Sequence, residues 1–158
     1  MKSASIVELK KELKSLSAAQ LLEVCMRLAK YKKDNKELLN YLLFEAGNEQ
    51  AYLDSIKAEM DEQFEEMNSS NAYLTKKSLR KILRTINKYI KYSGLAETEL
   101  ELLIYFCKKI KTSSIHKFLK TNTVLNNLYH QQLKKIDKTL KSLHEDLQYD
   151  YRRELERL

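Results

Sequence analysis

The chain has 158 residues, of which 43% are hydrophobic and 32% are charged, and its formal net charge is +7 at pH 7. This length and composition fit one globular domain and exclude an intrinsically disordered chain. Proline is absent and only two glycines are present. Because tight turns and strand connections depend on those two residues, the composition predicts an all-α protein with short polar loops.

The sequence also predicts the cellular compartment of the protein. The first residues read as a charged helix and not as a signal peptide, and no segment approaches the ~18 apolar residues of a membrane span. Cys25 and Cys107 each lie within an apolar helical segment, so we expect two reduced, buried thiols and no disulfide framework. We therefore expect a cytoplasmic protein with no membrane partner.

The first four helices are marked by their starts. Ser5–Glu8 and Ser17–Gln20 have the spacing of capping boxes, in which a serine hydroxyl accepts from a free backbone amide and the third residue reaches back. Asp34–Glu37 is expected to open a third helix, Gly47 to adopt a left-handed cap and Asn48 to open a fourth. Apolar residues recur behind each start at spacings of three and four, and these stripes are expected to face the core.

The next two helices differ in their apolar pattern. A helix from about residue 75 to 92 carries leucine and isoleucine on one face, and Gly94 is its expected cap. Thr98–Glu101 is read as another capping box. It precedes the run 102–107, which is apolar on every side, so this helix is expected to be the most enclosed element. A buried strand is rejected because charged residues flank the run without a turn residue.

The end of the chain reads as one long helix. After a short helix at 115–120, nothing stops a helix that begins at Thr123 before Leu158, and its apolar residues follow heptad spacing: Leu133, Ile136, Leu140, Leu143 and Leu147. Such a helix would be ~50 Å long, against a radius of gyration of ~15 Å for a domain of this size. Either it kinks near residues 144–146, or the segment 145–158 projects and packs on a partner.

Together these elements predict a single domain over residues 1–158. We expect an all-α helical bundle or short α-α solenoid of about six to eight helices, with a long C-terminal helix.

The beginning of the chain also resembles a known kind of protein. The segments 9–17, 20–22 and 36–39 (LKKELKSLS, QLL and KELL) are similar to a pattern in small uncharacterised bacterial proteins, which are domains of unknown function that open with a short helix and a helical hairpin. The resemblance covers about the first 45 residues. It implies a small bacterial helical protein and transfers no catalytic or binding residue.

Charge is segregated along the sequence. Residues 45–68 hold eight acids and one lysine, residues 69–92 hold seven bases and no acid, and residues 108–143 hold nine lysines and one aspartate. The bases of the second segment recur at helical spacing opposite the apolar stripe: Lys77, Arg80, Lys81, Arg84, Lys88 and Lys91.

Three interpretations of this basic face are open. The acidic helix 48–68 and the basic helix could form an antiparallel hairpin whose charged flanks face each other or water, where exposed ion pairs contribute only ~0–1 kcal/mol each. The basic faces of 76–91 and 108–141 could instead join into a nucleic-acid surface, with Tyr89 and Tyr92 stacking on bases. Binding to a membrane surface is weaker, because the core needs the apolar face of this helix.

No pattern indicates catalysis. His116, His130 and His144 are fourteen residues apart, about 21 Å between neighbours on one helix, which excludes a shared metal ion. No glycine-rich phosphate loop is present, and nothing in the sequence favours a nucleophilic pair such as Cys107 with His130. We expect no catalytic, cofactor-binding or metal-binding residue, and no enzyme.

The sequence therefore favours a non-enzymatic helical interaction or scaffold protein, with a protein partner or a second copy of itself. The expected interface lies on the C-terminal helix, where aromatic and arginine side chains join the heptad stripe: Leu147, Tyr151, Arg152, Leu155 and Leu158. The alternative is nucleic-acid binding through the basic faces.

Overall fold

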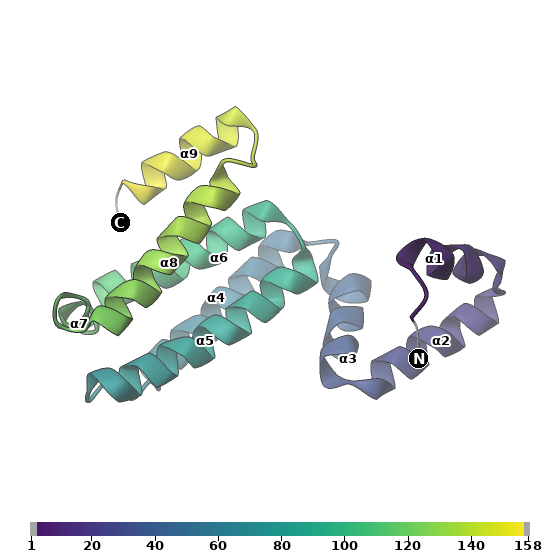
Figure 1. Cartoon of the computed structure of the whole chain (residues 1–158), viewed down its shortest axis with the longest axis horizontal. Helices are drawn as coiled ribbons and strands as arrows, with labels where there is room; N and C mark the ends of the chain where they lie inside the picture. The colour runs from purple at the N-terminus through teal and green to yellow at the C-terminus, as the bar shows by residue number, and fades with distance from the viewer. Residues whose placement is uncertain (1–2, 157–158) are drawn as a thin grey trace. The chain divides into compact units, whose positions relative to one another are not determined.

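The computed structural model describes residues 3–156, and the all-α prediction is confirmed. The structure is 83% helical, and its described part holds nine α-helices, one short π-helical segment and no strand (Figure 1). The sequence predicts one domain, but the packing of the backbone divides the chain into two compact units, Met1–Phe44 and Glu45–Leu158.

The first unit contains α1 (Ile6–Ser15), α2 (Ala18–Tyr31) and α3 (Lys33–Asn40). The π-helical segment η1 (Tyr41–Glu45) follows α3 and leads into the second unit. In Figure 1 these elements are purple to blue. Neither α1, α2 nor α3 buries a side chain, so this unit has no apolar core within its own three helices.

Two of the three predicted starts in this unit are confirmed. Both serine capping boxes form: the amide of Glu8 donates to the Ser5 hydroxyl at 3.3 Å, and the amide of Gln20 donates to the Ser17 hydroxyl at 3.3 Å. The prediction at Asp34 is wrong, because α3 begins at Lys33 and has no side-chain cap. The α2–α3 turn is closed differently, by the side-chain amide of Asn35 donating to the backbone carbonyl of Leu28 at 2.9 Å.

The second unit is built around one enclosed helix. It contains α4 (Glu49–Glu65), α5 (Ala72–Ser93), α6 (Ala96–Thr112), α7 (His116–Thr121), α8 (Thr123–Leu140) and α9 (Glu145–Leu155). Helix α6 packs against α4, α5, α7 and α8, and Figure 1 shows α4, α5, α6 and α8 lying alongside one another. Its apolar side chains are at most 1% exposed: Leu100, Leu102, Leu103, Ile104, Phe106, Cys107 and Ile110. The predicted enclosure is confirmed.

The helix ends of this unit agree with the sequence only in part. Asn48 caps α4 through its side chain, and Gly94 is a left-handed cap with φ 69°, both as predicted. The left-handed cap expected at Gly47 is wrong, since Gly94 alone among residues 3–156 has a positive φ. The predicted Thr98 cap is also wrong, because α6 already begins at Ala96 and the buried Thr98 hydroxyl donates to Glu49 of α4.

The C-terminal segment forms two helices, so the single long C-terminal helix of the sequence prediction is interrupted. Helix α8 ends at Leu140, and α9 begins at Glu145 after a turn in which the His144 imidazole accepts from the amide of Asp146. Lys108 of α6 forms an ion pair with Glu154 of α9, and the Tyr151 hydroxyl donates to Glu101 of α6 at 3.4 Å. Of the two alternatives left open by the sequence, the helix bends back and does not project (Figure 1).

Ion pairs also join α4 to α6. Lys57 pairs with Glu101 at 2.7 Å, Lys109 pairs with Asp61 at 2.8 Å, and the Tyr105 hydroxyl donates to both oxygens of Asp61 at 2.8 Å. Partial burial by itself would raise the pKa of Asp61. The hydrogen bonds from Lys109 and Tyr105 together with the lysine charge outweigh it, and they hold the pKa below its ordinary value.

The two glycines give a matched test of backbone strain. We expect Gly94→Ala to lower the free energy of unfolding by about 1–2 kcal/mol, because an L-residue is strained at φ 69°. Gly47→Ala should be neutral or slightly stabilising, since a Cβ there meets nothing within 4 Å and φ is not positive. Urea denaturation of both variants measures the difference, and equal losses would contradict the assigned caps.

The Asp61 contacts predict a pH dependence. A carboxyl whose pKa is lower in the folded chain stabilises the fold above its unfolded pKa, about 3.9, and this stabilisation is lost as the pH falls through the folded pKa. Asp61→Asn should therefore lose less stability than wild type between about pH 7 and pH 3, as measured by urea denaturation across that range.

Glu62→Gln is the control, because the Glu62 side chain is exposed and has no ion-pair partner among residues 3–156. It should follow the wild-type curve. Identical curves for wild type and Asp61→Asn would show that the fold does not favour the ionised carboxyl.

Candidate functional site

The predicted basic face exists on α5. Lys77, Arg80, Lys81, Arg84 and Lys91 are exposed, and none of the five forms an ion pair with any residue from 3 to 156. The apolar side of the same helix is buried in the core through Leu79, Ile82, Ile86 and Ile90. That side is unavailable to a membrane surface, in agreement with the sequence interpretation.

Lys88, the sixth predicted cation, is partly buried beside the two tyrosines. Its ammonium lies 5.1 Å from the Tyr89 ring centroid and 6.0 Å from that of Tyr92. The two rings meet edge to face at 6.2 Å, and the Tyr89 hydroxyl donates to Glu59 of α4 at 2.8 Å. Both tyrosines are thus packed within the fold, and they are not an open platform for stacking bases.

Lysines of α5 and of α8 come together around one cavity. A cavity of about 510 Å³ opens between α5, α6 and α8, and Lys91, Lys135 and Lys138 line it. Lys135 is already bound to Glu99 of α6 at 2.7 Å and to the side-chain oxygen of Asn87 at 2.9 Å. Lys91 and Lys138 have no ion-pair partner among residues 3–156.

Part of the predicted C-terminal interface is half-buried within the fold. Tyr151 is half-buried on α6, as described above, and Leu155 is half-buried at the edge of a pocket. Leu147 is 37% exposed, and the exposed Arg152 reaches Gln148 on its own helix at 3.4 Å. Leu158 lies outside the described residues. Of the four predicted interface residues that the structure describes, Leu147 and Arg152 are exposed.

An exposed apolar surface lies elsewhere, on the first unit, and the sequence interpretation missed it. The stripes expected to face a core are open to solvent, including Leu22 at 64% and Leu28 at 56% exposure. The expected burial of Cys25 is likewise wrong. We call these side chains of α1 and α2 the N-terminal apolar surface: Ile6, Val7, Leu9, Leu13, Leu21, Leu22, Val24, Met26, Leu28 and Tyr31.

A groove continues this surface. Between α2 and α3 a cavity of about 250 Å³ is lined by Cys25, Leu28, Ala29, Asn35, Leu38, Leu39 and Leu42. The sequence contains one indication that these stripes are exposed: a unit of ~44 residues is too short to bury a sizeable core. The stripes have the spacing of core helices, and spacing alone does not show whether anything covers them.

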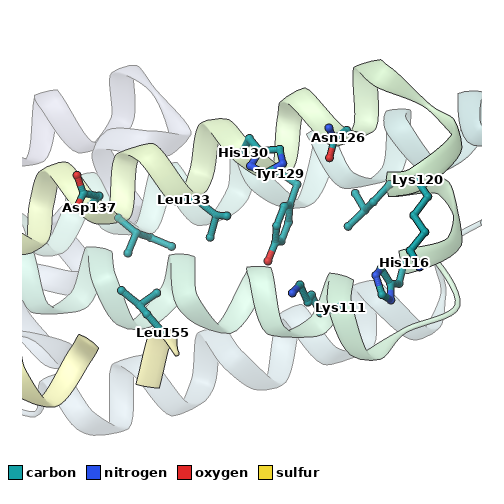
Figure 2. A pocket seen from close by; sticks show the side chains of 11 residues that line it. Lys111, His116, Lys120, Asn126, Tyr129, His130, Leu133, Asp137 and Leu155 are labelled. Atoms are coloured by element: carbon teal, nitrogen blue, oxygen red, sulfur yellow. The ribbon is translucent and has the colours of Figure 1, made fainter. Parts of the chain in front are cut away.

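A second pocket lies in the other unit and is shown in Figure 2. It has a volume of about 500 Å³ and is lined by residues from α6, α7, α8 and α9, with Tyr129 crossing its middle. His116 and His130 both line it, although the sequence interpretation placed no function on either.

The groups considered for catalysis form neither a metal-ligand cluster nor a reactive thiolate within residues 3–156. Within residues 3–156 no three His, Cys, Asp or Glu side chains gather as metal ligands would. Cys107 is fully buried, and burial raises the pKa of its thiol to about 12, so it cannot supply a thiolate. His144 is exposed and lies 3.5 Å from Asp146, two residues away.

Comparison with known proteins finds no family model, no curated protein and no solved structure that matches this chain. No helix in residues 3–156 is long and apolar enough to cross a membrane.

The two thiols provide a test of these environments. In native protein a disulfide reagent such as 5,5′-dithiobis(2-nitrobenzoate) should modify Cys25, which is exposed, and leave Cys107 unmodified because it is buried and protonated. Absorbance of the released thiolate counts the reacting cysteines, with the second appearing only in denaturant. Cys25→Ser should abolish the native reaction, and a remaining fast reaction would contradict the burial of Cys107.

Proposed function

We propose that this protein is a non-enzymatic interaction protein, and that it binds another protein chain through the N-terminal apolar surface. The observation that carries the proposal is that α1 and α2 expose ten large apolar side chains while α1–α3 bury none. Ten exposed apolar side chains on two short helices exceed the scattered single residues that are normal on a folded protein, which favours an interaction site.

The stability of the first unit supports the same conclusion. Isolated helices shorter than about 12–15 residues are marginal in water, and α1, α2 and α3 have 10, 14 and 8 residues. Folded helices of this length depend on packing of an apolar face. A partner that covered the stripes would supply that packing.

The energy of burial is comparable to the cost of association. Full burial of one leucine-sized side chain contributes about 1.5–3 kcal/mol, and association itself costs about 4–15 kcal/mol. Burying six such side chains would contribute at most about 9–18 kcal/mol, so a stable complex needs most of the exposed side chains to be covered. A second copy of the chain is the simplest partner, and a different helical protein is the other.

The proposal also includes a cytoplasmic location. The two cysteines are both free thiols, which supports a reducing compartment.

Light scattering and affinity purification test the proposal. Leu22→Ser with Leu28→Ser should lower the solution mass to that of one chain or remove the proteins retained from nuclease-treated native lysate, because both substitutions interrupt the apolar surface without touching a buried side chain. Leu147→Ser is the matched control on α9.

Two results would overturn the proposal. One is a monomeric wild-type chain whose captured proteins are unchanged in the double variant. The other is loss of association in Leu147→Ser alone, which would return the interface to the C-terminal helix.

The second candidate is nucleic-acid binding by the basic face of α5. The observation in its favour is the row of five exposed cations without ion-pair partners in residues 3–156. Bound phosphates would release counterions, so binding should weaken steeply with salt.

Charge reversal distinguishes this candidate. The triple variant Arg80→Glu, Lys81→Glu, Arg84→Glu should weaken binding to labelled single- or double-stranded oligonucleotides by about tenfold or more at about 50 mM salt. The control reverses Lys10, Lys11 and Lys14 on α1 and carries the same change in net charge. Fluorescence anisotropy measures both, and equal effects would show that α5 holds no specific surface.

A further inference from the structure

The pocket of Figure 2 is formed where α6 ends and α7 turns the chain back into α8. Its volume of about 500 Å³ lies within the range of about 300–1,000 Å³ that small-molecule sites occupy. Helix α9, which is held on α6 by the Lys108–Glu154 ion pair, contributes Leu155 at one end. The pocket therefore depends in part on the bend between α8 and α9.

The Tyr129 hydroxyl reaches the open space of the pocket. The residue as a whole is only 4% exposed, and its hydroxyl makes no hydrogen bond to any residue from 3 to 156. Because no buried side-chain oxygen in that range lacks a partner, this hydroxyl is accessible in the pocket. Figure 2 shows the ring crossing from α8 with its hydroxyl directed toward Lys111 of α6. Burial, with a smaller contribution from nearby Cys107, raises the pKa of Tyr129 to about 12. The hydroxyl therefore stays protonated and can donate a hydrogen bond.

The charge of the pocket is one-sided. Lys111 and Lys120 line it beside the imidazoles of His116 and His130, and neither lysine has an ion-pair partner in residues 3–156. The one carboxylate in the lining, Asp137, is already paired with Lys141 at 2.6 Å. Among residues 3–156 the lining thus offers several donors for an anion and no unpaired acid.

Most of the remaining lining is apolar, and Asn126 is the other polar side chain in it. Figure 2 places His116 and Lys120 at one end, Tyr129 and Lys111 in the middle, and Leu133 and Leu155 toward the other end. Ile136 and Leu119 complete the apolar lining. A ligand that fits this arrangement has an anionic head and an apolar body.

We propose that this pocket binds a small organic anion, with a phosphate or carboxylate head held by Lys111, Lys120 and the Tyr129 hydroxyl, and an apolar body lying along Leu133 and Leu155. The site is independent of the N-terminal apolar surface and of the basic face of α5. It makes the second unit a ligand-binding module, in addition to any protein partner of the first unit.

The experiment titrates the full-length protein with 1-naphthyl phosphate and follows backbone amide shifts by NMR. Shifts are expected at α7 and α8. Neutral 1-naphthol and inorganic phosphate, which each lack one half of the ligand chemistry, should bind at least about tenfold more weakly.

Variants identify the residues responsible. Lys111→Gln and Lys120→Gln should each weaken binding by about tenfold, and Tyr129→Phe should weaken it by several-fold while leaving the unfolding midpoint unchanged, because the hydroxyl has no partner to lose. Lys134→Gln is the matched control, since Lys134 is exposed on α8 and does not line the pocket.

Several results would overturn the proposal. Equal binding of 1-naphthol would show that the anion is not recognised, and equal binding of inorganic phosphate would show that the apolar lining is not used. Shifts confined to α1–α3 or to α5 would place the probe elsewhere. An equal loss in Lys134→Gln would reduce the effect to net charge.

Discussion

The enclosure of α6 is the constraint on which the second unit depends. Because the run Leu102–Cys107 is apolar on every side, no single neighbour can cover it, and α4, α5, α7 and α8 all pack against it. Burial of side chains of this size contributes about 1.5–3 kcal/mol each. The remaining helices are arranged to supply that cover, and the turns between them are placed by the same requirement.

The distribution of charge follows from this arrangement. The polar edges of α6 take up charged groups of α4, α8 and α9: Glu101 pairs with Lys57, Lys109 with Asp61, Glu99 with Lys135 and Lys108 with Glu154. Five cations of α5 therefore have no ion-pair partner within residues 3–156. The outward cations of α5 stay exposed, and the lysines at the end of α6 and on α7 surround a pocket.

The first unit lacks such a central helix. Its helices are amphipathic and capped by Ser5 and Ser17, so each is well specified locally, yet their apolar stripes meet no interior. A helix of this kind is stabilised by whatever covers it. The second unit has a complete core, whereas the three helices of the first unit have none. For this reason we propose that the second unit binds a ligand and that the first unit binds a partner.

Local chemistry in the sequence determined the helical class, the serine caps, the glycine cap at Gly94 and the enclosure of α6, because these depend on neighbours within a few residues. Contacts between distant residues decided the rest. The Thr98 hydroxyl bonds to Glu49 instead of capping α6, the chain bends after Leu140, and the Tyr129 hydroxyl is left unpaired in a pocket. Spacing specifies which face of a helix is apolar, but only the packed structure specifies whether another helix covers that face.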